Sequence, residues 1–284
     1  MDPTYRVDQW QTVDTQLFWA YRGNVAREFR HSKEPSYHYG LWHLYQGRTE
    51  IDYGGGRLKA KKGDFVFLPP SKRTQDFTNN TELLSIRFLL NGPDGAPLLD
   101  CEHPMRLKGD TGALSHRGEE LATRVLEGFG PYRFNLYRAK GRPAAHFELN
   151  SAFTRFLAAL IQQLEDMGIG FNRLGDMDNR VVTCINRVKQ SPMDKRWTEI
   201  DMAKVAGVSP VHLNRPFQES VGITAHTWLD EYKLTHARLV LMTDVQIKEA
   251  AYSLGFSSPQ HFSTWFKRKT GQTPKEFRQT REEA

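Results

Sequence analysis

The chain has 284 residues, a length that is typical of about two domains. Its 39 Lys plus Arg outnumber its 33 Asp plus Glu, and this moderate basic excess favours an acidic partner without approaching that of a histone-like protein. Two cysteines, Cys101 and Cys184, exclude a disulfide framework and a thiolate zinc cluster, and they fit a reducing compartment. The sequence opens without a secretory signal pattern and has no apolar run long enough for a membrane span, so we expect a soluble cytoplasmic protein with no membrane partner.

Short strands dominate the segment from Tyr37 to about Leu90. Apolar or alternating stretches are separated there by turns that contain glycine or proline. These stretches are GLWHLYQG (40–47), TEIDY (49–53), RLKA (57–60), FVFLPP (65–70) and LLSIRFLL (83–90). Their spacing predicts an antiparallel barrel or sandwich.

Helical periodicity begins beyond about Gly112, with LSHRGEELATRVLEGF (114–129) and a second helix over 147–166. The second helix carries an apolar stripe, made of Phe153, Phe156, Leu157, Leu160, Ile161 and Leu164. Two interpretations of this stripe remain open: it packs onto the barrel, or it forms a helix pair across a homodimer interface. The glycine-rich segment 168–178 follows and is the candidate linker.

An internal repeat occupies the last third, which also carries most of the positive excess. The segments GVSPVHLNRPFQESVG (207–222) and GFSSPQHFSTWFKRKTG (255–271) align with one extra residue in the second turn. Each has a glycine-containing turn, a helix with two core-facing apolar residues, and a glycine that stops the helix. Together with the helix before each turn, this is the pattern of a helix-turn-helix.

Individual residues of the repeat have physical roles. Small Ala203 and Ala251 permit close approach of the first helix to the second. Ser209 and Ser258 are expected to cap the second helices, and Thr198 with Asp201 predicts a capping box. The outward-facing residues of the second helices suit base edges in a major groove, and Arg215 is the strongest candidate. The full set of expected base contacts is Val211, His212, Asn214, Arg215, Gln260, His261, Ser263 and Thr264.

Pro216 is unexpected, because a proline inside a helix removes one backbone hydrogen bond and costs about 3 kcal/mol. We expect it on the boundary between the core face and the groove face. One hypothesis is that packing of Leu213 and Phe217 holds the helix while a kink re-aims Asn214 and Arg215. The alternative is a tolerated, slightly destabilising substitution.

The segment IKEAAYSLGFSSPQHFSTWFKRKTGQTPKEFR (247–278) resembles the AraC-type transcription factors. The resemblance implies two helix-turn-helix units joined by a long helix, here 223–242, with both recognition helices in successive major-groove faces of double-stranded DNA. It implies phosphate contacts as well, assigned to Ser209, Ser258, Lys267, Arg268 and Lys269. It further implies a homodimer that activates transcription through RNA polymerase. Thr264 departs from the family, which usually has Arg there.

The first half is similar to the cupin-type sensor barrels of that family, on the segment 47–77. Gly63 keeps the spacing of metal-binding cupins, but Thr74 takes the place of the histidine, and His38 and His43 do not form the usual His-x-His pair. We therefore expect no metal and no cofactor. Aromatic faces and Arg or His side chains suit a small-molecule effector of the sugar class, bound by Arg30, His38, Trp42, His43, Tyr45 and Arg87.

Taken together, the sequence predicts an α+β protein that is not an enzyme. We expect a cupin-like antiparallel β-barrel with flanking helices over 1–167, which binds the effector and forms the dimer. A linker (168–178) then leads to an all-α domain with two helix-turn-helix motifs (179–284). The expected function is that of a DNA-binding transcription activator. Two alternatives stay open: a cupin-type metalloenzyme with an accessory DNA-binding domain, and a dimeric regulator that binds no ligand.

Overall fold

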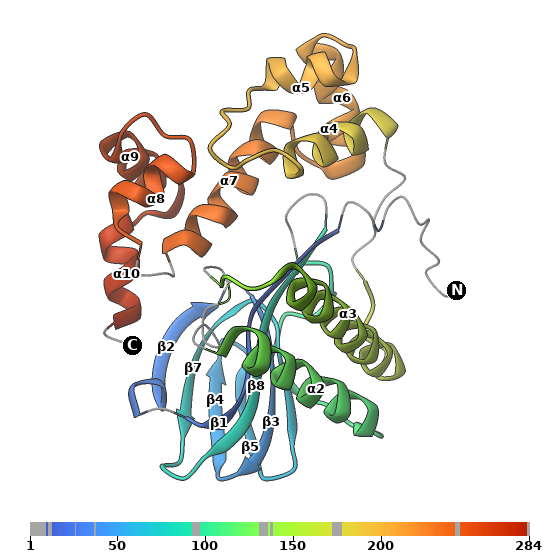
Figure 1. Ribbon diagram of the computed structural model, residues 1–284, viewed down its shortest axis with the longest axis vertical. Helices are drawn as coiled ribbons and strands as arrows, with labels where there is room; N and C mark the ends of the chain where they lie inside the picture. Colours follow the sequence, from blue (N-terminus) through green and yellow to red (C-terminus); the bar gives the residue numbers. More distant parts are fainter. Residues whose placement is uncertain are drawn as a thin grey trace. The chain divides into compact units, whose positions relative to one another are not determined.

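The computed structural model describes residues 10, 13–25, 27–36, 38–92, 97–130, 136, 139–171, 178–241 and 245–282. The chain divides into two compact units (Figure 1). Among the described residues, the barrel unit holds those within 15–90 and 99–171, and the helical unit holds those within 178–282 together with 10, 13–14, 91–92 and 97–98. The division after residue 171 falls inside the expected linker 168–178, of which 172–177 lie outside the described residues.

Two antiparallel sheets form the barrel unit. Along the first sheet the strands are β1 (Asp14–Asn24), β8 (Glu82–Asn91), β3 (Tyr39–Gln46), β6 (Phe65–Leu68) and β9 (Met105–Arg106). Along the second they are β2 (His31–Ser36), β7 (Ser71–Phe77), β4 (Arg48–Tyr53) and β5 (Gly56–Lys61). A short 3-10 helix, η1 (Arg27–Phe29), precedes β2. All five strand stretches expected from the sequence are strands, so the predicted antiparallel β architecture is confirmed.

The core of the barrel unit lies between the two sheets. Trp42 of β3 meets Phe77 of β7 edge to face, with ring centres 4.8 Å apart. Leu44, two residues along β3, belongs to the same cluster of buried side chains. The alternate residues Leu41 and His43 therefore point to the opposite, outer face of the first sheet.

Helices α2 (Gly112–Phe129) and α3 (Pro143–Asp166) cover that outer face. At Gly118 of α2 an added Cβ would lie 2.8 Å from Leu84 Cδ2, so any larger residue there would require the Leu84 side chain of β8 to shift. Phe153 and Phe156 of α3 pack edge to face on Phe88 of β8, at centre distances of 6.2 and 5.9 Å.

The apolar stripe of α3 is used within the protomer. Five of its six residues, Phe153, Phe156, Leu157, Leu160 and Leu164, are buried, and Ile161 is half-buried. This placement confirms the interpretation that the stripe packs onto the barrel. It also corrects the assignment of these residues to a dimer interface, because buried side chains offer no surface to a second copy.

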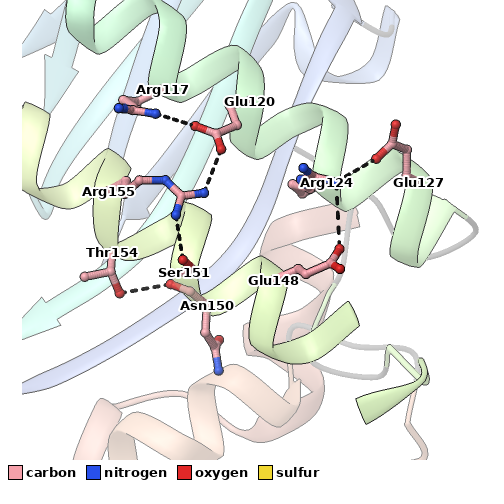
Figure 2. A network of polar contacts seen from close by, with 9 residues as sticks. All are labelled: Arg117, Glu120, Arg124, Glu127, Glu148, Asn150, Ser151, Thr154 and Arg155. Atoms are coloured by element: carbon pink, nitrogen blue, oxygen red, sulfur yellow. Dashed lines mark hydrogen bonds and ion pairs between the residues drawn. The ribbon is translucent and has the colours of Figure 1, made fainter. Parts of the chain in front are cut away.

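The outward side of the α2–α3 pair is charged (Figure 2). Arg155 of α3 donates to Glu120 of α2 at 2.6 Å, and Arg117 donates to the other oxygen of the same carboxylate at 2.9 Å. These contacts lower the pKa of Glu120. Two large apolar side chains are exposed on the same pair of helices, Leu126 at 56% and Phe147 at 75%.

The helical unit contains α4 (Asn179–Lys189), α5 (Glu199–Ala206), α6 (Pro210–Val221), α7 (Ala225–Leu241), α8 (Ile247–Ser253), α9 (Pro259–Thr270) and α10 (Pro274–Glu282). It has two hydrophobic cores, one around Phe217 and one around Phe262. Helix α7 spans both, because its Trp228 belongs to the first core and its Leu234 to the second. None of the helices in the described ranges is long and apolar enough to cross a bilayer.

Candidate nucleic-acid interface

Each half of the repeat folds as a helix, a glycine turn and a second helix, α5–α6 and α8–α9 (Figure 1). The turn glycines Gly207 and Gly255 have φ of +68° and +76°, a left-handed conformation that residues with a Cβ rarely adopt. Ala203 and Ala251 are buried in the two hydrophobic cores of the helical unit. The expected turn role of the two glycines is therefore confirmed, and the burial of the two alanines agrees with their expected place between helices.

Serine caps fix where the two second helices begin. Ser209 Oγ accepts from the backbone N–H of His212 at 3.3 Å, and Ser258 Oγ accepts from that of His261 at 3.2 Å. Both caps are followed by a proline in the first turn, whose fixed φ suits a helix start. Each second helix thus begins at a defined residue with its first turn oriented.

The capping box at the start of α5 is formed as expected. Thr198 Oγ1 accepts from the N–H of Asp201 at 3.2 Å, while the Asp201 carboxylate accepts from the N–H of Thr198 at 3.0 Å. Hydrogen bonds from Thr198 lower the pKa of Asp201.

Helix α6 presents three of the expected base-contacting side chains to solvent. Val211 is 79% exposed, His212 is exposed, and the Arg215 side chain is 84% exposed. Arg215 Nε lies 2.9 Å from Glu219 Oε1, one turn along the helix, and this contact raises the pKa of Arg215. The guanidinium is thereby held on the exposed face while its remaining N–H groups can meet a base edge.

Asn214 does not point outward, which corrects its expected orientation. Its side chain is half-buried, and its amide contacts Glu199 of α5 and the backbone of Ala225 in α7. The position lies on the flank of α6 that packs against neighbouring helices.

Pro216 also differs from its expected place on the boundary between core and groove faces. It is buried within α6, which runs from Pro210 to Val221. The equivalent residue in α9 is Trp265, and it is buried as well. Pro216 therefore occupies a core position, and whether it re-aims Arg215 stays a hypothesis.

Helix α9 exposes Gln260, His261 and Thr264. The His261 ring packs edge to face on Phe256, with centres 5.7 Å apart. Ser263 is half-buried and donates to the carbonyl of Pro259 at 2.8 Å.

The basic cluster at the end of α9 divides into two kinds of side chain. Lys267 and Arg268 are exposed. Lys269 Nζ lies 2.7 Å from Asp230 Oδ2 of α7, with the two side chains only 24% and 21% exposed. Lys269 therefore links α9 to α7, whereas Lys267 and Arg268 face solvent.

In the barrel unit, two of the six expected effector-binding residues face the space between the sheets. Trp42 belongs to the core cluster there, and Arg87 lies 4.8 Å above the Trp19 ring. Trp19 Nε1 donates to Ser85 Oγ at 3.0 Å, and Ser85 pairs across the sheet with Trp42. Ser85 was not among the expected residues, although strict alternation along β8 from Arg87 places it on the same face.

The other four expected residues lie elsewhere. His43 stacks on Phe65 at 3.9 Å on the outer face of the sheet. Tyr45 donates to Glu119 of α2 at 2.5 Å, and burial together with this bond raises the Tyr45 pKa. His38 packs against Phe18, and Arg30 bonds to Asn79 and to the carbonyl of Val25. These four side chains therefore do not lie with Trp42 and Arg87 on the inner face, and the six expected effector-binding residues do not form one site.

Three comparisons with known proteins bear on this interface. A family model described as "Helix-turn-helix domain" matches residues 202–280. The HTH-type transcriptional regulator GlxA of Rhizobium meliloti (strain 1021) is 34% identical over 68% of this chain and 51% of its own length. The arabinose operon regulatory protein of Escherichia coli (strain K12) is 31% identical over 36% of this chain and 35% of its own.

Among solved structures, ToxT from Vibrio cholerae O395 is similar with a TM-score of 0.43 and 14% identity, over 95% of this chain and 98% of that one. The chain spans about half the length or less of the two curated relatives. The matched segment 202–280 contains both helix-turn-helix units described above. By these two units and its relatives, the segment 202–280 is a helix-turn-helix domain of the AraC type of transcriptional regulators.

Proposed function

We propose that the protein binds specific sites on double-stranded DNA and regulates transcription from them. The observation that carries this proposal is the pair of capped recognition helices, α6 and α9, each with polar side chains on its solvent face. Helices of this kind enter the major groove, where each base pair presents a distinct set of donors and acceptors.

The proposed DNA contacts are of two kinds, contacts to base edges and contacts to phosphates. Arg215 and Gln260 are exposed and carry the donors that suit guanine and adenine edges. Lys267 and Arg268 supply charge for phosphates, which holds the protein on the duplex without selecting a sequence. The caps Ser209 and Ser258 lie at helix N-termini, where phosphates also bind, and we retain them as proposed phosphate contacts.

A small-molecule effector bound between the two sheets of the barrel unit controls this activity in our proposal. The inner face offers the ring of Trp19 beside Arg87, and Ser85 beside Trp42. An aromatic face next to polar donors suits a sugar, and a sugar remains the proposed effector class. Isothermal titration against mono- and disaccharides tests the class, and an absence of heat with every member contradicts it.

We further propose that the protein acts in the cytoplasm as a homodimer and activates transcription through RNA polymerase. In this proposal, residues 1–167 bind the effector and form the dimer, 168–178 are the linker, and 179–284 bind DNA. Because the apolar stripe of α3 is buried, the exposed side of α2 and α3, with Leu126 and Phe147, is the surface we propose for the dimer. Sedimentation of the full chain, alone and with Phe147→Glu, tests it.

Selection of DNA by the full chain is the experiment that tests the function. Random duplexes are enriched on the protein at two salt concentrations, and the affinity of the recovered sites is measured. We expect a small set of related sequences whose affinity falls steeply with salt, because bound phosphates release counterions. Uniform weak binding to all duplexes would contradict a sequence-specific regulator.

A further inference from the structure

The two helix-turn-helix units differ in how the second helix is held, and this difference assigns a role to Asn214. We propose that Asn214 positions helix α6 for DNA binding and does not itself contact a base. The inference rests on the proposed function, because it concerns which residues of α6 meet the DNA.

The amide of Asn214 joins three helices. Its Nδ2 donates to Glu199 Oε1, in the first turn of α5, at 2.5 Å. Its Oδ1 accepts from the backbone N–H of Ala225, the first residue of α7, at 3.1 Å. A carboxylate only accepts and a backbone N–H only donates, so one orientation of the amide satisfies both partners. We call these two bonds the Asn214 bridge.

The Ala225 end of the bridge meets a specific need. Ala225 is fully buried, and as the first residue of α7 it has an N–H without a partner inside its own helix. A buried donor left without an acceptor is unfavourable, so the position facing it must supply an oxygen. Asn214 does so from the middle of α6.

The second unit needs no acceptor at the corresponding position, because the following helix starts with a proline. In the repeat, Pro274 corresponds to Ala225 and Ser263 to Asn214. Pro274 has no N–H, so no acceptor is required at the start of α10. Ser263 accordingly bonds back to the carbonyl of Pro259 in its own helix at 2.8 Å.

The bridge has a consequence for recognition. It holds α6 at mid-length against the starts of α5 and α7, next in sequence to the exposed Arg215. The direction of the Arg215 side chain therefore depends on a residue that does not touch DNA. Base contacts from α6 fall to Val211, His212 and Arg215, which are exposed.

The inference is tested by giving the first unit the residues that the second unit has at the same two positions, serine for Asn214 and proline for Ala225. The full chain is compared with Asn214→Ser, with Asn214→Ser plus Ala225→Pro, and with Arg215→Ala as a base-contact variant. Affinity is measured for the selected site and for its single base-pair variants, well below the melting temperature of each protein so that all are fully folded.

We expect Asn214→Ser to weaken binding to the selected site about tenfold and to reduce the preference at the base pair that Arg215 reads, since it removes the buried hydrogen bond on which the direction of Arg215 depends. Adding Ala225→Pro, which removes the stranded N–H, is expected to restore affinity to within about threefold of the unmodified chain. Loss of preference at one base pair that Ala225→Pro does not restore would show instead that Asn214 contacts a base. Unchanged affinity in Asn214→Ser would also overturn the proposal.

A second pair of variants guards against poor folding of the proline variant. Asn214→Asp keeps an acceptor for Ala225 but sets two carboxylates against each other, and Glu199→Gln then restores a donor. We expect Asn214→Asp to lower the melting temperature and the combined variant to recover it; independent effects of the two changes would contradict the bridge. This thermal readout needs no DNA, so it remains decisive if the unmodified chain selects no sequence and the proposed function itself fails.

Discussion

At the scale of single residues, Arg215 carries the largest share of the proposed base recognition. Arg215→Ala is expected to lower affinity for the preferred site about tenfold to a hundredfold and to relax the preference at one base pair, since a bidentate contact contributes about 1–3 kcal/mol of discrimination. Competition binding with base-substituted duplexes measures both effects. Val211→Ala is the control, because Val211 lies on the same exposed face. This variant is expected to lower affinity without changing the preference for the base that Arg215 reads. Equal losses on every duplex for Arg215→Ala would contradict base recognition.

The two turn glycines provide a matched pair for stability. A Cβ on Gly255 would lie 2.4 Å from the carbonyl oxygen of Asp194, whereas a Cβ on Gly207 would meet nothing within 4 Å. Both have positive φ, so alanine at either position is expected to cost about 1 kcal/mol of backbone strain. Gly255→Ala should lose more than that, because the backbone of Asp194 must shift. Urea unfolding of the two variants measures the difference, and equal losses would show that the segment around Asp194 yields freely.

Residue-level sequence reasoning succeeded where one residue type meets one local need. Ser209, Ser258 and the Thr198–Asp201 box cap helices as predicted, because the partners of a cap lie within three residues. Asn214 was misplaced because its partners, Glu199 and Ala225, lie on other helices. Helical periodicity assigns a face but not the crossing of neighbouring helices that decides whether a flank is buried.

At the scale of elements, the basic end of α9 should divide by role. Lys267→Ala and Arg268→Ala are each expected to reduce the slope of log affinity against log salt by about one, as for a lost phosphate contact. Lys269→Ala should change the slope less and lower stability instead, because Lys269 pairs with Asp230 in a largely buried setting.

Titrations of DNA binding at several salt concentrations give the slopes, and a double-mutant cycle with Asp230→Ala gives the coupling of the Lys269 pair. An unchanged melting temperature for Lys269→Ala, combined with a full unit of lost slope, would assign Lys269 to phosphate after all.

The elements predicted from sequence are those with a clear period. Strands β3, β4, β5, β6 and β8 and the helices of the repeat were found because apolar residues recur regularly and glycine marks their ends. Strand β7 was missed because SKRTQDF has only one apolar residue, Phe77, and takes its place from pairing with β2 and β4. The face of α3 could be predicted from its stripe, but the surface that covers it could not, because a sheet and a second helix bury such a stripe equally well.

At the scale of the whole molecule, the chain provides one thiol in each compact unit. Cys101 lies half-buried in the barrel unit and Cys184 is buried in the first core of the helical unit. The Cys184 thiol lies 3.2 Å from the carbonyl of Met202. The two thiols therefore allow the opening of each unit to be followed separately in the unmodified protein.

Burial raises the pKa of Cys184 from its ordinary 9.0 to about 11, because the thiolate is poorly solvated in the core. The unfolded chain releases this proton first as pH rises. The contribution of Cys184 to stability is therefore intact below about pH 9 and is lost as pH rises toward 11. Cys184→Ala should make the helical unit less sensitive to pH across this window, in urea titrations at pH 8 and pH 10.5.

The rate of Cys184 alkylation at pH 8 tests whether DNA binding stabilises the helical unit. Cys184 should react only when the helical unit opens, since a buried, protonated thiol is a poor nucleophile. A ligand at a hundred times its Kd stabilises the closed form by about 2.7 kcal/mol, so a selected DNA site at that excess should slow the reaction of Cys184 about a hundredfold. Cys101, which belongs to the other unit, should be labelled at an unchanged rate. Peptide mass spectrometry of timed samples separates the two rates, and equal protection of both thiols would mean that DNA binding closes the barrel unit as well, and that the two units respond to DNA as one.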